Sequence, residues 1–250
     1  MTNFYFIDSN IIIGYCNPLD IFHDVSVNFF KEKDKYHTFL LFSVQEEFYR
    51  KMEDEKIKFL TTILGRHSLL QFPKLQKIIN KKQNKPIIQQ SNFLKYIVHL
   101  FQKNKITEIS YTKIIEIFDE YKQVLRSRFN NLIGNWIKKP YMNQHHIIYK
   151  DRDYLYYYNL LNPSIHRLDA IHLSLACYEV RRRNRRNRSQ EYYFYTNDRD
   201  WLNKDLNSKI KIRNLTIKKL NYKKIPLKKG FNPLTNSFNL DTYEYIPDNL

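Results

Sequence analysis

The stretch FYFIDSN, residues 4–10, is the most informative part of the chain for its fold. It is an apolar run that ends on the carboxylate of Asp8. Apolar runs that end on an acid are typical of buried parallel strands, which deliver their carboxylates to one edge of a sheet. Carboxylates brought together repel one another, and a divalent cation is the common remedy. Three further segments carry acids in similar contexts, namely SVQEEF (43–48), RLDAIH (167–172) and FYTNDRD (194–200).

These four segments, in this order, resemble the PIN domain family of ribonucleases. The resemblance covers residues 3–14, 38–50, 165–177 and 192–203. It implies a three-layer α/β/α fold with a central parallel sheet. It also implies RNA cleavage by Mg²⁺ or Mn²⁺ held by four acids, which at the matching positions are Asp8, Glu47, Asp169 and Asp198. Asp200 would lie close to the same metal.

The remaining sequence predicts a nuclease core interrupted by an insertion. We assign residues 1–65 and 151–220 to the core, 66–150 to a mostly helical basic insertion, and 221–250 to a C-terminal tail. Apolar periodicity predicts the following elements. Strands are expected at 4–8, 38–42, 192–196 and 210–217, and helices at 9–16, 20–33, 43–64, 93–103 and 112–129. A further helix is expected from Asn162-Pro163 to about Arg181, while 154–161 fits either a strand or a helix.

The two adjacent glutamates call for separate roles. Ser43 and Glu46 match a capping box, in which the acid reaches back to the amide of the first capping residue. Glu47 is turned about 100° further round the helix and is therefore free to face the metal. Asp8 has an alternative role as a helix N-cap. Ser9 and Asn10 are better candidates for that cap, which leaves Asp8 for the metal.

The other acids also have structural alternatives. Asp169 lies in an otherwise apolar helix, where a salt bridge to Arg167 would be the alternative to metal binding. Of Asp198 and Asp200, one can cap the following helix while the other binds the cation. Three neighbours are expected to support the ligands without binding the metal directly. They are Asn10, His172 and Thr196.

Positive charge is segregated from these acids. The net charge is +17, yet residues 1–65 contain seven Lys and Arg against ten Asp and Glu. Residues 66–150 contain sixteen basic residues against four acidic ones, and RRRNRRNR (181–188) adds six arginines. Basic surfaces beside an acidic metal site favour a polyanionic substrate, although a merely solvated basic surface is the alternative. The predicted nucleic-acid track is Arg181, Arg182, Arg183, Arg185, Arg186 and Arg188.

Other classes of function find little support. The chain has four Gly and no Gly-rich phosphate loop, and its two cysteines predict neither a disulfide framework nor a zinc site. No signal peptide or membrane span is expected, which favours the cytoplasm. The sequence thus predicts a Mg²⁺- or Mn²⁺-dependent ribonuclease acting on RNA, with DNA left open. A toxin of a toxin–antitoxin pair, with an antitoxin or a second copy as partner, and a non-cleaving RNA-binding scaffold are the alternatives.

Overall fold

A computed structural model describes most of the chain outside the C-terminal tail. The described residues are 3–20, 22–32, 37–64, 69–80, 91–137, 148–185, 190–198, 201, 206–210, 212 and 214–219. The expectations for the tail at 221–250 and for Asp200, Arg186 and Arg188 lie outside these ranges.

A four-stranded parallel sheet forms the centre of the fold, as the sequence predicted. Its strands are β1 (Asn3–Ile7), β2 (Thr38–Phe39), β5 (Glu191–Thr196) and β6 (Leu215–Lys219), in the order β2-β1-β5-β6. The register pairs Phe6 with Phe39 on one side and with Phe194 on the other. All four strands therefore present their carboxyl ends to the same edge, where Ile7 and Thr196 end β1 and β5.

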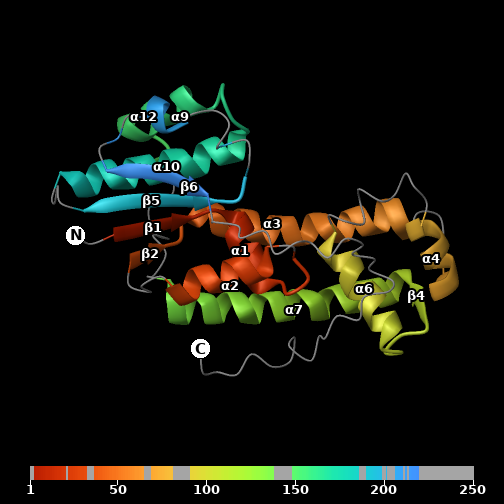
Figure 1. The fold of residues 1–250 in the computed structure, drawn as a ribbon. Helices are drawn as coiled ribbons and strands as arrows, with labels where there is room; N and C mark the ends of the chain where they lie inside the picture. The colour runs from red at the N-terminus through yellow and green to blue at the C-terminus, as the bar shows by residue number, and fades with distance from the viewer. Residues whose placement is uncertain are drawn as a thin grey trace.

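Helices cover both faces of this sheet (Figure 1). On one face lie α9 (Arg152–Leu161), α10 (Arg167–Asn184) and the short α12 (Leu206–Ile210). On the other lie α1 (Ser9–Cys16) and α2 (His23–Glu32), with α3 (Phe42–Lys58) starting beside them. Both α1 and α10 contact β5 directly. The protein is thus a mixed α/β chain with its sheet between two helical layers.

Residues between α3 and α9 extend the molecule away from the sheet (Figure 1). A π-helical segment, Phe59–Leu64, prolongs α3. The strands β3 (Leu69–Gln71) and β4 (Glu108–Ser110) form a separate antiparallel pair, although helices lie between them in the chain. The helices here are α4 (Phe72–Asn80), α6 (Asn92–Gln102) and α7 (Tyr111–Trp136). The long α7 returns along the molecule and packs against α1, so the inserted helices share a continuous apolar core with the sheet.

Aromatic side chains build much of that core. Phe4 stacks between Phe39 and Tyr192 across three neighbouring strands, and Phe48 of α3 stacks on Phe129 of α7. Such pairs add to the stabilisation by buried area, which is the main favourable term in folding. Both cysteines, Cys16 and Cys177, are free thiols buried in this core.

Several predicted boundaries were wrong. Asn162-Pro163 lies in the turn before α10, which begins at Arg167 and not at Asn162, while the segment 154–161, for which strand and helix were both open, belongs to helix α9. Proline is compatible with both a helix start and a turn, which explains the error. The last strand begins at Leu215, because residues 206–210 form α12. Within the described ranges, no helix has the length and apolar character needed to cross a bilayer.

Candidate metal centre

Asp8 lies at the centre of the candidate site, directly after β1. Its amide donates to the Tyr195 carbonyl at 3.0 Å, which continues the β1–β5 pairing past the last strand residue. The carboxylate accepts from the Ser9 amide at 2.6 Å and therefore caps α1. The expectation that Ser9 or Asn10 would serve as the cap was wrong. Capping uses one carboxylate oxygen, Oδ1, and leaves lone pairs for other partners.

Two predicted supporting residues hold the second oxygen of Asp8. Thr196 Oγ1, at the end of β5, donates to Oδ2 at 2.7 Å, and Asn10 Nδ2 donates to the same atom at 2.9 Å. Thr196 Oγ1 in turn accepts from the Asp198 amide, and Asn10 Oδ1 accepts from the Asn197 amide. The ends of β1 and β5 are thereby joined through side chains, which fixes the orientation of the Asp8 carboxylate.

Glu47 and His172 complete a buried cluster with Asp8. Each residue offers one ligand atom, and these three atoms lie within 4.8 Å of one another. His172 Nδ1 is 3.7 Å from Asp8 Oδ1, and His172 Nε2 is 3.5 Å from Glu47 Oε2. These distances exceed hydrogen-bond length, and neither ring nitrogen nor Glu47 Oε2 has a hydrogen-bond partner in the part of the chain that is described.

The charges around Asp8 favour its ionised form. Burial disfavours the carboxylate, but His172, the Thr196 hydroxyl and the more distant Lys51 ammonium outweigh it and lower the pKa of Asp8 below its usual range. Lys51 lies one helical turn after Glu47 and contacts Glu47 Oε1 at 3.1 Å and Ser9 Oγ at 3.0 Å. Lys51 thus compensates the buried negative charge of Glu47. The sequence alone did not predict this role for Lys51, although the i,i+4 spacing of the two residues on a helix favours such a pair.

Asp169 lies one turn before His172 on α10, in the first turn of that helix, which begins at Arg167. Burial, and then repulsion by Asp8 and Asp198, raise the pKa of Asp169 to about 6. The indole of Trp201 opposes that shift, although its N–H does not meet hydrogen-bond geometry with any described partner. The structure does not bring Asp169 or Asp198 into the close group of ligand atoms formed by Asp8, Glu47 and His172, as far as its described residues show. A bound cation would reduce the repulsion between the carboxylates of Asp8, Asp169 and Asp198 and would favour the ionised form of Asp169.

The helix carrying Glu47 starts differently from the prediction. The N-cap of α3 is Leu41, which makes no side-chain cap, so Ser43 and Glu46 do not form the expected capping box. Ser43 is buried inside the first turn, and Glu46 is exposed to solvent. The separation of the two glutamates nevertheless follows the helical turn, since Glu47 is buried and points to Asp8 and His172.

The alternative role of Asp169, a salt bridge to Arg167, is not seen among the described ion pairs.

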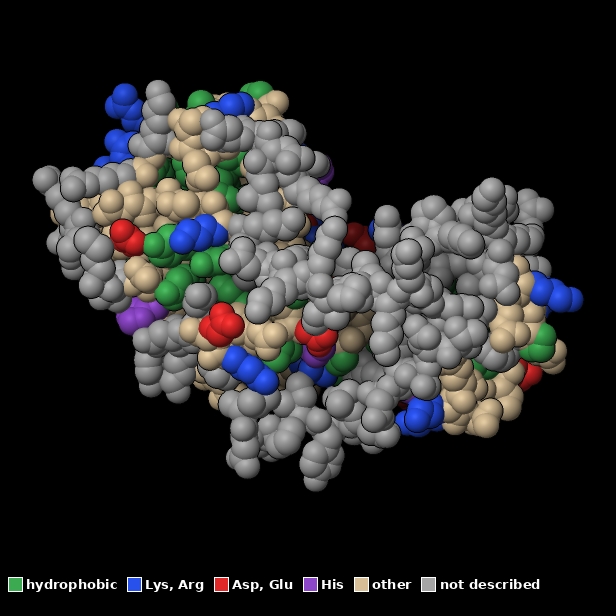
Figure 2. Space-filling model, viewed as in Figure 1, with side chains coloured by type: hydrophobic (Ala, Val, Ile, Leu, Met, Phe, Trp, Pro, Cys, Tyr) green, Lys and Arg blue, Asp and Glu red, His purple; other side chains and the backbone are tan. Residues whose placement is uncertain are grey.

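The predicted nucleic-acid track is partly neutralised by acids. Four of its six arginines pair with acidic side chains and do not form an open cationic surface. Arg182 and Arg183 both bind Glu179, at 3.1 and 2.6 Å, and Arg181 and Arg185 both bind Asp153, at 3.2 and 2.9 Å. Among the described side chains visible in Figure 2, Lys and Arg occur in separate small groups. Part of the charge of the arginine run is therefore neutralised locally.

No protein-family model, curated protein or solved structure matches this chain. The resemblance to the PIN domain family therefore stays a prediction from the quoted motifs. What the structure adds is the convergence of a buried Asp8, Glu47 and His172 from three elements, which could hold a metal ion.

Proposed function

We propose that this protein is a metal-dependent ribonuclease of the PIN type, which hydrolyses RNA phosphodiester bonds at the site around Asp8. The observation that carries the proposal is the buried convergence of Asp8, Glu47 and His172 at the carboxyl edge of a parallel sheet. Among the described residues, Asp169 and Asp198 are not part of this close group, although repulsion by Asp8 and Asp198 contributes to the raised pKa of Asp169. Active sites of open α/β folds form at this edge.

The donor set fits a hard divalent cation. Glu47 Oε2 is buried without a hydrogen bond, and burying a carboxylate oxygen is costly unless a donor or a cation satisfies it. Asp8 and Glu47 would hold the cation, with Asp169 and Asp198 as further oxygen ligands. The imidazole of His172 adds a donor that Mn²⁺ accepts more readily than Mg²⁺ does. The ion would activate water and neutralise charge on the scissile phosphate.

The residues of the chain have identifiable tasks in that chemistry. Thr196 and Asn10 orient the Asp8 carboxylate through hydrogen bonds of 2.7 and 2.9 Å, which keeps the ligand in one rotamer. Lys51 holds Glu47 and places a positive charge next to the acids, where it would also attract a phosphate group. His172, buried between the two carboxylates, keeps them apart and limits their mutual repulsion.

The two adjacent glutamates provide a matched test of this function. Glu47→Gln should lower Mn²⁺-dependent RNA cleavage by at least about a hundredfold, because a charged ligand is lost. It should also abolish the rise in melting temperature that Mn²⁺ produces in the wild type. Glu46→Gln should leave both measurements unchanged, since Glu46 is exposed.

Purified wild-type protein would be assayed on single-stranded RNA and DNA with Mg²⁺, Mn²⁺ or EDTA. Cleavage of RNA that stops in EDTA is the expected result. Persistent cleavage in EDTA would remove the metal from the mechanism. RNA binding with neither cleavage nor any stabilisation by Mn²⁺ would favour the non-cleaving scaffold.

A further inference from the structure

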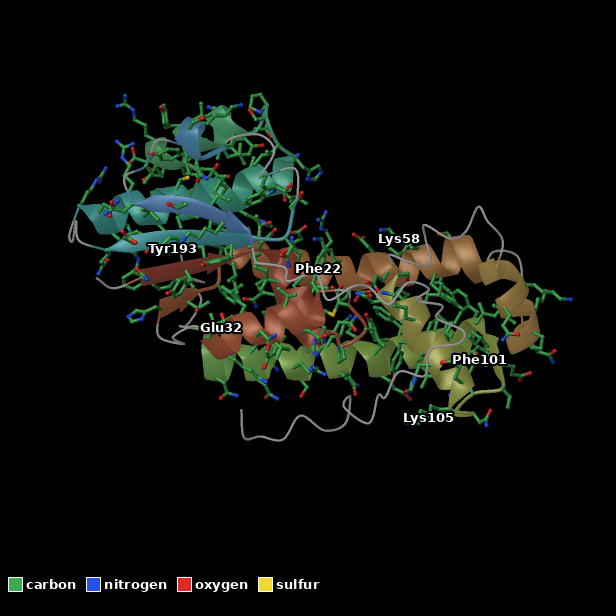
Figure 3. The ribbon with its side chains drawn as sticks, in the orientation of Figure 1. Phe22, Glu32, Lys58, Phe101, Lys105 and Tyr193 are labelled. Carbon is green, nitrogen blue, oxygen red and sulfur yellow. The ribbon has the colours of Figure 1, made fainter. Side chains whose placement is uncertain are left out.

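A large cavity opens next to the candidate metal centre. It has a volume of about 560 Å³ and lies between α1, α3, α6 and α7. Asn10 and Lys51 line it, and the same two residues contact Asp8 and Glu47 at the metal centre. Figure 3 labels Phe22, from the α1–α2 connection, and Lys58, at the end of α3, which also line it. Cavities of this size are typical of sites for small organic groups.

The α3 side of the cavity carries three cations and two carboxylates, Asp54 and Glu55. Arg50, Lys51 and Lys58 all line it and follow one another along α3, away from the metal centre. Arg50 and Lys51 both pair with Glu47, at 3.7 and 3.1 Å, but they are partly exposed, at 52% and 41%, and can therefore also meet a ligand from solvent. Three cations along one helix beside a nuclease site suit the phosphates of a single strand that continues past the cleavage point, with the two carboxylates between Lys51 and Lys58.

The cavity also has a polar wall of acceptor groups, which begins on α3 itself at Asp54 and Glu55. Glu55 accepts from the Phe93 amide at the start of α6 at 2.6 Å, and Asp20 accepts from Asn92 Nδ2 at 2.8 Å. Asn17 donates to the Tyr121 hydroxyl at 2.8 Å. These bonds join α1, α3, α6 and α7, so the wall is preformed. Carboxylates there would repel a phosphate but accept from the N–H groups of a base.

Apolar surface completes the cavity. Phe22, Phe48 and Met52 line it, together with the polar wall. Bases of single-stranded RNA are held by side chains that pack on their faces and by hydrogen bonds to their edges. Guanine is the base whose Watson–Crick edge carries two adjacent N–H donors, so it matches one carboxylate best.

We propose that this cavity binds an unstacked guanine base of the substrate RNA, held by the Glu55 carboxylate, while Arg50, Lys51 and Lys58 bind the adjoining phosphates. The inference rests on the proposed ribonuclease function and deepens it, since it makes the cavity a determinant of which RNA sequence is bound beside the metal centre.

Binding of short oligonucleotides tests the proposal on the full chain. Fluorescent nine-nucleotide RNAs would be titrated at pH 8.5, above the raised pKa of Glu55, so that its carboxylate is ionised, and in EDTA, which prevents metal-dependent cleavage. One RNA is all uridine, one carries a single central guanosine, and one carries inosine in its place. Guanosine should tighten binding about tenfold over uridine. Inosine lacks the 2-amino donor and should lose most of that gain.

Variants separate the base contact from the phosphate contacts. Glu55→Gln should remove the preference for guanosine and leave the affinity for the uridine RNA unchanged. Lys58→Ala should weaken all three RNAs equally and reduce the salt dependence of binding. The inosine comparison uses wild-type protein and does not depend on the folding of any variant.

The outcomes distinguish this inference from the proposed function. Equal affinity for the guanosine, inosine and uridine RNAs, in a protein that still cleaves RNA with Mn²⁺, would overturn the guanine cavity and leave the ribonuclease proposal intact. Guanosine monophosphate binding as tightly as the guanosine RNA would also overturn it, because the cavity would then be a nucleotide site independent of RNA. Failure to bind or cleave any RNA would overturn both proposals.

Discussion

Replacing Glu55 by glutamine should flatten the pH dependence of this protein's stability between about pH 4.5 and pH 7. Burial, together with the nearby charge of Asp20, raises the pKa of Glu55 to about 7 from an ordinary value of 4.5, against the opposing effect of the Phe93 amide. In this window the folded protein keeps a proton that the unfolded chain has released. The stability contributed by Glu55 is therefore fully present below about pH 4.5 and is lost as pH rises through 7.

The magnitude follows from the size of this shift. At 1.36 kcal/mol per unit, the change from 4.5 to about 7 corresponds to about 3 kcal/mol. Glu55 is half-buried and reaches a cavity, so solvent screens part of this effect and we expect about 2 kcal/mol. Glutamine keeps an oxygen that can accept from the Phe93 amide, and it does not ionise.

Urea unfolding at pH 5 and pH 8, followed by circular dichroism, measures this effect. From pH 5 to pH 8, the free energy of unfolding of the wild type should fall by about 2 kcal/mol more than that of Glu55→Gln. Contributions from other titrating groups cancel in that comparison. Glu46→Gln, an exposed glutamate on the same helix, should behave as the wild type does. An equal loss of stability in the wild type and in Glu55→Gln would refute the assignment of a raised pKa to Glu55.

Two further pairs of variants test the packing. Gly14→Ala should destabilise the protein by about 1–3 kcal/mol, because a Cβ there would lie 2.5 Å from Ser26 Oγ and 3.1 Å from the Phe22 carbonyl oxygen. Gly134→Ala, in α7 with nothing within 4 Å, should be neutral or stabilising by up to about 1 kcal/mol, and thermal unfolding of both would show the contrast. Arg183→Ala should cost about 1–2 kcal/mol, since Arg183 pairs with the nearly buried Glu179 at 2.6 Å and lies 4.5 Å from the centre of the Phe39 ring. Arg185→Ala removes a more exposed ion pair with Asp153 and should change stability by less than about 1 kcal/mol, so equal losses in the two variants would contradict the importance of the Glu179 cluster.

The central sheet could be predicted from the sequence, because its physical signal is local. The runs FYFID and YYFYT are apolar, short and rich in aromatic residues, which is typical of strands buried on both faces. They form β1 and β5, paired in parallel. The difference between Glu46 and Glu47 was also predictable, since a turn of 100° decides which side chain faces the core. The start of that helix was not, because Ser43 suits both a cap and a buried first turn.

Only the tertiary structure decided what surrounds the acids. The distance between Asp8 and His172 depends on how α10 packs over the sheet, which no local pattern encodes. The partners of Arg183 also depend on tertiary packing. The sequence predicted that Arg183 would bind RNA, but its guanidinium pairs with Glu179 and lies over the ring of Phe39. The cavity beside the site exists because α6 and α7 close over α1 and α3, so its polar wall joins residues far apart in the chain. Sequence periodicity determines which face of each element is buried, whereas the packing of whole elements determines which buried polar groups meet.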